Sequence, residues 1–242
     1  MTTLPATNPL IAGPAPDVTQ VEIPADGGML KAHMARPKGV ASGPAVIVIH
    51  AQRGLQPVIR DTADGLASSG YIAVAPDLLS REGGTDAIGP DGVPDILHAA
   101  PRERFSADAV AVVRWLKAMP EVTSIGIIGF CFGGGVTWRA ATESTDIAAA
   151  VPCYGSNPPL ENVANITAAV HGVYGALDER VNAGIPAINK ALHAANVTHV
   201  LKQYDGAGHS FMSHTSETSY VAEASQAAWA DALAWFDKYL PR

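Results

Sequence analysis

The sequence has few of the residues that several common classes of protein depend on. It holds only two cysteines, Cys131 and Cys153, among 242 residues, which is too few for a disulfide framework, and their setting does not suggest metal-ligand spacing. Lys and Arg number 16 against 23 Asp and Glu, so there is no basic excess to attract nucleic acid or an anionic membrane surface. We therefore expect two reduced thiols and a small-molecule partner.

Targeting segments are also missing from the pattern. The first basic residue is Lys31, so the start of the chain lacks the charged and apolar regions of a secretory signal. No apolar run approaches the length of a membrane span. These absences predict a cytoplasmic protein without a membrane partner, and they favour neither a monomer nor a homodimer.

The length and composition predict one main domain. With 48% hydrophobic residues the chain can bury one large core, and α/β folds of this length usually form a single domain. Residues 1–18 carry four prolines among small residues and predict an irregular arm before a domain over residues 19–242. Residues 81–101, rich in Gly, Pro and Asp without periodicity, predict a loop that is either a lid over the active site or a tolerated surface insertion.

Short apolar runs alternate with stretches of helical periodicity along the domain. The runs at residues 45–49 and 71–75 are typical of strands buried on both faces, and an apolar stripe over residues 105–118 predicts a helix. The alternation predicts an α/β fold, a mostly parallel central sheet with helices on both faces. Further strands are predicted at residues 124–128, 147–151, 169–174 and 199–204, and further helices at 58–69, 182–195 and 222–239.

The sharpest motif is Gly-Phe-Cys-Phe-Gly-Gly at residues 129–134, between a predicted strand and a helical pattern. It fits the G-x-nucleophile-x-G elbow of the α/β-hydrolase fold, with Cys131 where most of these enzymes have serine. So sharp a turn needs small residues beside it. It also places the thiol at a helix N-terminus, which favours the thiolate. The alternative interpretation is a buried structural cysteine in a glycine-rich turn.

Two more residues follow Cys131 in the order that this fold uses. Asp178 stands just after one predicted strand and His209 lies in a glycine-lined loop after the last strand. Singly, these residues are more often a helix cap and a loop histidine. Together, all three fall at the carboxyl ends of strands, where open α/β sheets bind ligands. We therefore predict a Cys-His-Asp triad that cleaves an ester or lactone through a cysteine-acyl intermediate, without metal or organic cofactor.

Over about residues 20–240 the chain resembles the dienelactone hydrolase family, the carboxymethylenebutenolidase-like α/β-hydrolases. The resemblance is carried by GFCFGG around Cys131, the Gly-x-x-Asp turn that ends at Asp178, GAGHSF around His209, and YIAVAPDLLSR at residues 71–81. It implies that Cys131 is the nucleophile, His209 the base and Asp178 the residue that orients the base.

The resemblance also implies an oxyanion hole. Its two donors would be the backbone N–H of Phe132 and that of Gln52, in the loop after the strand at residues 45–49. In that loop the family usually carries a glutamate that restrains the resting thiol, and here Ala51 takes its place. Because the substitution removes a negative charge near Cys131, we expect a standing thiolate paired with His209.

Substrate-binding residues are less clearly marked. The family's arginine just beyond the catalytic histidine is absent, since Met212, Ser213 and His214 occupy that region. Arginines beside the predicted cleft are the candidates for a substrate carboxylate, and aromatic residues beside the motifs, Phe211 among them, suggest an apolar wall. The candidate arginines are Arg53, Arg81, Arg102 and Arg104. The alternative function is a non-catalytic small-molecule-binding protein on the same fold.

Overall fold

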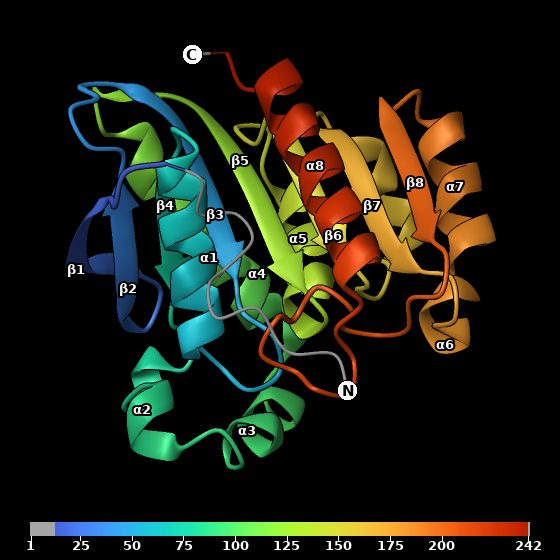
Figure 1. The fold of residues 1–242 in the computed structure, drawn as a ribbon, viewed down its shortest axis with the longest axis horizontal. Coiled ribbons are helices and arrows are strands. Elements are labelled where there is room, and N and C mark those ends of the chain that lie inside the picture. Colours follow the sequence, from blue (N-terminus) through green and yellow to red (C-terminus); the bar gives the residue numbers. More distant parts are fainter. Residues whose placement is uncertain (1–12, 242) are drawn as a thin grey trace.

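The computed structural model describes residues 13–241, built around an eight-stranded sheet in the order β1-β2-β4-β3-β5-β6-β7-β8 (Figure 1). The expected arm at residues 1–18 lies mostly outside the described residues, and its last two residues already belong to β1. The strands are β1 Asp17–Ala25, β2 Gly28–Arg36, β3 Gly43–Ile49, β4 Ile72–Pro76, β5 Val122–Phe130, β6 Ala149–Cys153, β7 Ala169–Gly175 and β8 His199–Tyr204.

β2 alone runs opposite to the other seven strands of the sheet. β1 pairs antiparallel with β2, and β2 pairs antiparallel with β4. From β4 to β8 every neighbouring pair is parallel, which confirms the predicted mostly parallel sheet. Pure apolar runs form the central strands because both faces are covered; all seven residues of β3 are buried.

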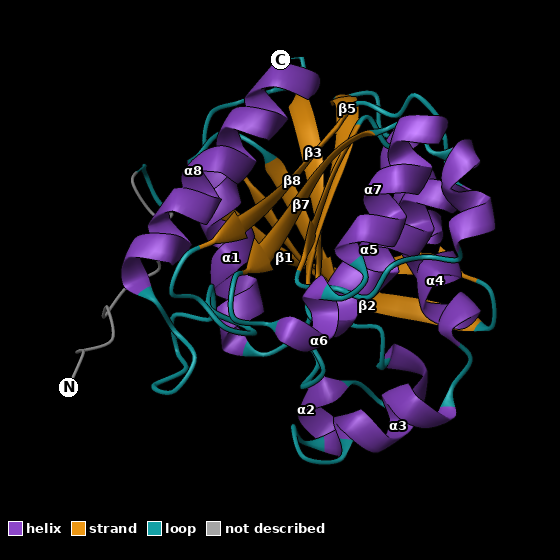
Figure 2. Ribbon diagram, turned by 90° about the vertical axis from the view of Figure 1, so that its right-hand side faces the viewer, coloured by secondary structure: helices purple, strands orange, loops and turns teal. Residues whose placement is uncertain are grey.

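Helices cover both faces of the sheet, as predicted, with α1 and α8 on one side and α4, α5 and α7 on the other (Figure 2). Each face encloses its own cluster of buried apolar side chains. None of the helices in residues 13–241 is long and apolar enough to cross a membrane. The helices are α1 Pro57–Ser68, α2 Thr85–Ile88, α3 Val93–Ala99, α4 Arg102–Lys117, α5 Phe132–Glu143, α6 Glu179–Asn182, α7 Ile185–Ala194 and α8 Ala222–Tyr239, with 3₁₀ turns at Ser80–Glu82 and Leu160–Asn165.

The helix predicted at residues 182–195 is confirmed as α7, and a separate short helix, α6, precedes it. Pro186 stands in the first turn of α7, where its missing N–H costs nothing because the first helical amides have no intrahelical acceptor. A proline there ends the preceding helix rather than continuing it. The break places α6 beside the carboxyl end of β7.

The segment at residues 81–101 was expected to lack regular structure and instead contains α2 and α3, which lie beyond the carboxyl ends of the parallel strands (Figure 1). Helices this short show no clear periodicity. Thr85 fixes α2, because its amide and hydroxyl both donate to the buried Asp77 carboxylate, while the amide of Leu55 donates to the Thr85 hydroxyl. The contact is close: a Cβ on Gly54, whose φ is +81°, would lie 2.2 Å from the Thr85 Oγ1.

Candidate active site

The elbow predicted at residues 129–134 joins β5 to α5. Cys131 stands between them with φ 55° and ψ −111°, a conformation that costs free energy for any residue other than glycine and persists where the surroundings enforce it. Its amide donates to the Cys153 carbonyl oxygen at 3.0 Å. A Cβ on Gly129 would lie 2.3 Å from the Gly133 carbonyl oxygen, and one on Gly133 would lie 2.5 Å from the Ile49 carbonyl oxygen. The glycines are therefore required by backbone contact.

The structure brings Cys131, His209 and Asp178 into one hydrogen-bonded line. Nε2 of His209 lies 3.0 Å from Sγ of Cys131, and Nδ1 lies 2.5 Å from Oδ2 of Asp178. The Asp178 side chain is 5% exposed and that of His209 is 30% exposed. Asp178 also caps α6, since its Oδ1 accepts a hydrogen bond from the Val181 amide at 3.3 Å. Cap and histidine partner are thus two roles of one carboxylate.

Electrostatics favour the protonated form of His209. Its hydrogen bond with Cys131 raises the pKa of the imidazole most, burial lowers it, and the hydrogen bond with Asp178 raises it again, with a net upward shift. Both cysteines are free thiols, but Cys153 lies in the core, where burial raises the pKa of its thiol well above the usual value. Cys131, by contrast, has the imidazole of His209 as its hydrogen-bonding partner.

Two cavities meet at Cys131. A larger one of about 640 Å³ and a smaller one of about 220 Å³ share Gln52, Cys131 and Tyr154 in their walls. Apolar side chains from α1, the elbow, the loop after His209 and α8 line much of the larger cavity: Val58, Ile59, Phe130, Met212 and Trp229. His209 lies in the wall of the smaller cavity.

The two predicted oxyanion donors come from different segments, Phe132 from the elbow and Gln52 from the loop after β3. Phe132 begins α5, so its amide has no acceptor within the helix, and Gln52 lines both cavities. His50, which has no catalytic motif around it, has a structural role beside the Gln52 loop. Its Nδ1–H donates to the Ala51 carbonyl oxygen at 2.8 Å, and its Nε2 accepts from the Leu78 amide at 3.2 Å. Burial lowers the pKa of His50 and keeps it neutral.

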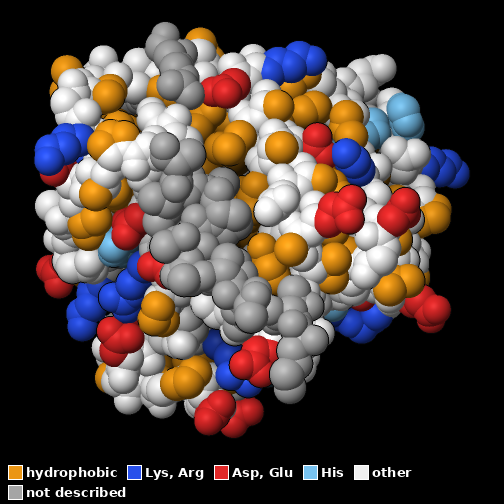
Figure 3. Space-filling model, viewed as in Figure 1, with side chains coloured by type: hydrophobic (Ala, Val, Ile, Leu, Met, Phe, Trp, Pro, Cys, Tyr) orange, Lys and Arg blue, Asp and Glu red, His pale blue; other side chains and the backbone are white. Residues whose placement is uncertain are grey.

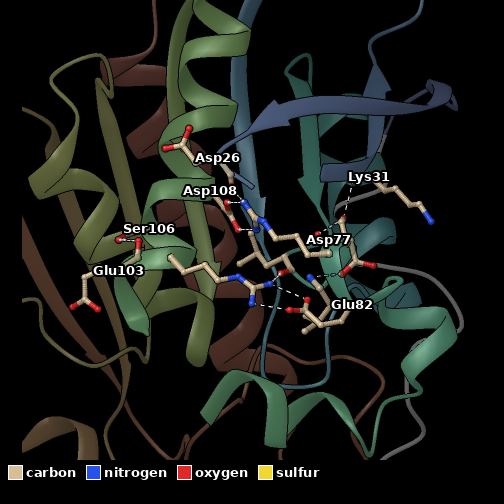
Figure 4. A network of polar contacts seen from close by, with 12 residues as sticks. Asp26, Lys31, Asp77, Glu82, Glu103, Ser106 and Asp108 are labelled. Carbon is tan, nitrogen blue, oxygen red and sulfur yellow. Dashed lines mark hydrogen bonds and ion pairs between the residues drawn. The ribbon is translucent and has the colours of Figure 1, made fainter. Parts of the chain in front are cut away.

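Two of the candidate arginines are committed to structural ion pairs, which corrects the expectation that they bind substrate. Arg81 holds both oxygens of the buried Asp108 carboxylate at 2.6 Å, and Arg104 binds Glu82 at 2.7 Å. Figure 4 shows Asp108 and Glu82 in this network, which links α4 to the loop after β4. Replacing either arginine would leave a charge without its partner.

The remaining candidates lie where the cavities open, except for Phe211. Arg53 is exposed and lines the larger cavity, and Arg102 is exposed and lines the smaller one. Phe211 is fully buried and packs against the rings of Tyr154 and Tyr204 at 5.7 and 5.5 Å. The expectation that it forms a wall of the site is therefore corrected, because the chain turns its ring into the core.

Tyr154 and Arg180 line the cavities, and neither was predicted as a site residue from the sequence. Tyr154 follows β6 directly with φ 39°, and its ring packs edge-on against His209 at 5.3 Å; burial, and to a lesser extent Cys153 and Cys131, raises the pKa of its phenol well above the usual value. Arg180 lies in the wall of the smaller cavity. Both stand just after a strand, the signal that identified Asp178, but neither carries a recognisable motif.

Sequence comparisons with known proteins all point to one family. The model of the dienelactone hydrolase family matches residues 30–240. A protein of Escherichia coli named "Putative carboxymethylenebutenolidase" is 33% identical over 205 residues, covering 78% of this chain and 75% of its own. A Methylorubrum extorquens protein of the same name is 30% identical over 219 residues, covering 84% of this chain and 73% of its own.

Solved structures agree with the sequence matches. The crystal structure titled "Putative Dienelactone Hydrolase" from Klebsiella pneumoniae is 31% identical, with a TM-score of 0.84, and covers 93% of this chain and 100% of its own. A dienelactone hydrolase from Anabaena variabilis, 22% identical with a TM-score of 0.73 over 94% of this chain and 100% of its own, shares the fold. The family match extends over the elbow, Asp178 and His209. The chain belongs to the dienelactone hydrolase family.

Proposed function

We propose that this hydrolase cleaves a carboxylic ester or lactone through a thioester formed on Cys131. The observation that carries the proposal is the line from Asp178 through His209 to Cys131, with contacts of 2.5 and 3.0 Å at the junction of two cavities. A nucleophile, a base and an orienting carboxylate in hydrogen-bonding reach are the requirements for acyl transfer.

In the proposed cycle the Cys131 thiolate attacks the ester carbonyl carbon, and the carbonyl electrons move to oxygen. The amides of Phe132 and Gln52 donate hydrogen bonds to this oxyanion. His209 then gives its Nε2 proton to the leaving alkoxide, which departs as an alcohol and leaves a thioester. Next, His209 removes a proton from water, and the hydroxide attacks the thioester carbonyl carbon to give a second oxyanion. Its collapse breaks the C–S bond, so that the carboxylic acid departs and the Cys131 thiolate is restored beside protonated His209. Asp178 keeps the Nδ1 proton in place throughout.

The acyl-enzyme itself is the direct test. After rapid mixing with p-nitrophenyl acetate and an acid quench within one turnover, peptide mass spectrometry should find one acetyl group on the peptide that contains Cys131. Release of p-nitrophenol should show a burst that matches the enzyme concentration. A protein that only binds small molecules would give no adduct and no burst, and that result would contradict the proposal.

Alkylation should reveal a thiolate held by His209. No Asp or Glu is among the described residues that line either cavity, and half-buried Ala51 lines the larger one together with Cys131. Because the pKa of His209 is raised, its protonated imidazolium form is favoured next to the Cys131 sulfur. We therefore expect iodoacetamide to modify Cys131 rapidly at neutral pH, with Cys153 protected by burial.

The His209→Gln variant should shift this reaction upward in pH. Without the imidazolium, the labelling rate should rise only as the pH approaches about 8.5, the value of a free cysteine. His98→Gln is the matched control, because His98 lines the smaller cavity and has its Nδ1 bonded to the Pro94 carbonyl oxygen instead. A wild-type profile with its midpoint at or above the free-cysteine value would refute the ion pair.

A further inference from the structure

The two cavities beside Cys131 differ in chemistry. Most of the wall surface of the larger one is apolar, with Phe130, Met212 and Trp229 among its side chains, and Arg53 and several Ser and Thr hydroxyls also line it. Its volume of about 640 Å³ is that of a complete ligand site. The smaller one, of about 220 Å³, has Arg102, Arg180 and His98 in its wall. A substrate that spans the sulfur therefore meets an apolar chamber on one side and a basic chamber on the other.

The charge of the smaller cavity is not neutralised by the protein. Among the described residues, neither Arg102 nor Arg180 forms an ion pair, and no carboxylate lines the cavity. The Arg102 guanidinium lies 5.8 Å from the centre of the Phe132 ring, next to the elbow. Arg102 is also the first residue of the 16-residue α4, a position where the helix dipole disfavours a cation.

Five arginines of the described chain pair with carboxylates, whereas Arg102 and Arg180, like Arg53 and Arg114, form no such pair. The chain carries a net charge of −7, and on the face shown in Figure 3 acidic and basic side chains are interspersed. Arg81 and Arg104 have carboxylate partners at 2.6 and 2.7 Å. Arg102 and Arg180, without such partners, leave two guanidinium groups in one cavity wall, and guanidinium groups bind carboxylate and phosphate in a planar, bidentate manner.

The position of His209 gives the substrate a direction. Among the described residues, the imidazole is in the wall of the smaller cavity and not in that of the larger one. A general acid must reach the leaving oxygen, so the alcohol part of the ester lies in the smaller cavity. The acyl part then lies across Cys131 in the larger, apolar cavity.

We infer that the substrate is an open-chain ester of an apolar acid with an alcohol that carries an oxyanion, a carboxylate or a phosphate. The assignment rests on the proposed function, since it requires Cys131 to attack the carbonyl between the cavities. It assigns Arg102 and Arg180 to the anion of the alcohol part. Arg53, at the larger cavity, has no part in binding that anion.

Matched aryl esters test both halves of the assignment. Acetyl, hexanoyl and succinyl esters of 4-hydroxybenzoate, 4-hydroxyphenyl phosphate and neutral 4-hydroxybenzamide vary the acyl and alcohol parts separately. The ratio kcat/KM reports all steps up to acyl-enzyme formation, so it includes recognition of the alcohol. The wild-type protein should prefer hexanoyl over acetyl and succinyl esters, and the anionic alcohols over the benzamide by about tenfold or more, as expected for charge-assisted hydrogen bonds.

Three variants separate the arginines. Arg102→Gln and Arg180→Gln should each lower kcat/KM for the anionic esters by about tenfold and leave the benzamide esters nearly unchanged. Arg53→Gln makes the same change of charge at the larger cavity and should preserve the preference. The carboxylate and phosphate arms show which oxyanion fits better.

Other results would overturn the assignment. It fails if the protein prefers succinyl esters, if the neutral alcohol is preferred, or if the anion preference survives in the Arg102→Gln, Arg180→Gln double variant. Hydrolysis of neutral acetyl esters through an adduct on Cys131 in any of these cases leaves the proposed function intact. If no ester gives turnover or an adduct on Cys131, both the proposed function and the substrate assignment are contradicted.

Discussion

Replacing Cys131 with alanine should lower kcat/KM for an activated ester by about 10⁵-fold, because removing the nucleophile of a triad leaves only binding and oxyanion stabilisation. The substitution removes the sulfur that lies 3.0 Å from Nε2 of His209 and leaves the side chains of His209 and Asp178 in the protein. Steady-state hydrolysis of p-nitrophenyl esters measures the loss, and circular dichroism checks that the fold is kept.

The second cysteine supplies the control for this substitution. Cys153→Ala removes the same atom from a fully buried site whose thiol faces the Val151 carbonyl oxygen at 3.6 Å. This variant should retain turnover even if it costs some stability. Wild-type rates in Cys131→Ala would mean that some other group attacks the ester, and the thioester mechanism would be abandoned.

Replacing Asp178 with asparagine should lower kcat by about 10³- to 10⁴-fold while KM changes little, because the orienting carboxylate acts on the histidine rather than on the substrate. The NH₂ group of the asparagine side chain would donate a hydrogen bond to Nδ1 of His209, which must then be unprotonated. That reverses the tautomer and leaves a proton on Nε2, which then cannot accept one from the Cys131 thiol. The imidazolium also loses its counter-charge.

The local fold should survive this substitution. Asparagine caps helices about as well as aspartate, so the hydrogen bond from the Val181 amide to position 178 is preserved. Asp205→Asn is the matched control, since Asp205 is exposed in the loop that carries His209 and should leave kcat unchanged. Equal losses in both variants would indicate a general effect of charge instead of orientation of His209.

The features that could be predicted from the sequence are those that depend on residues close together in the chain. Buried parallel strands are continuous apolar runs, and the elbow needs glycines where Gly129 and Gly133 meet carbonyl oxygens at 2.3 and 2.5 Å. Cys131, Asp178 and His209 could be assigned to one site from the sequence because each follows a strand, and the carboxyl ends of parallel strands lie along one edge of the sheet.

The features that escaped prediction depend on contacts between distant segments. The ion pair between Arg81 and Asp108, 27 residues away, has no local signature in the sequence. Arg81 was therefore predicted to bind substrate, although its role is structural. Tyr154 and Arg180 reach the cavities because of the way β6 and α6 end. Phe211 ends the histidine motif, yet its ring lies in the core, because the chain turns between His209 and Phe211 at Ser210, whose φ is 63°.

The bridge through Thr85 has a consequence for any attempt to change the specificity of this protein. Its hydroxyl joins α2 to Leu55, three residues beyond Gln52 in the sequence. Exchanging the helical segment for that of a relative would therefore disturb the amide assigned to the oxyanion along with the walls that select the substrate. A graft that carries Asp77, Gly54 and Thr85 as one unit would alter selectivity while sparing the chemical step.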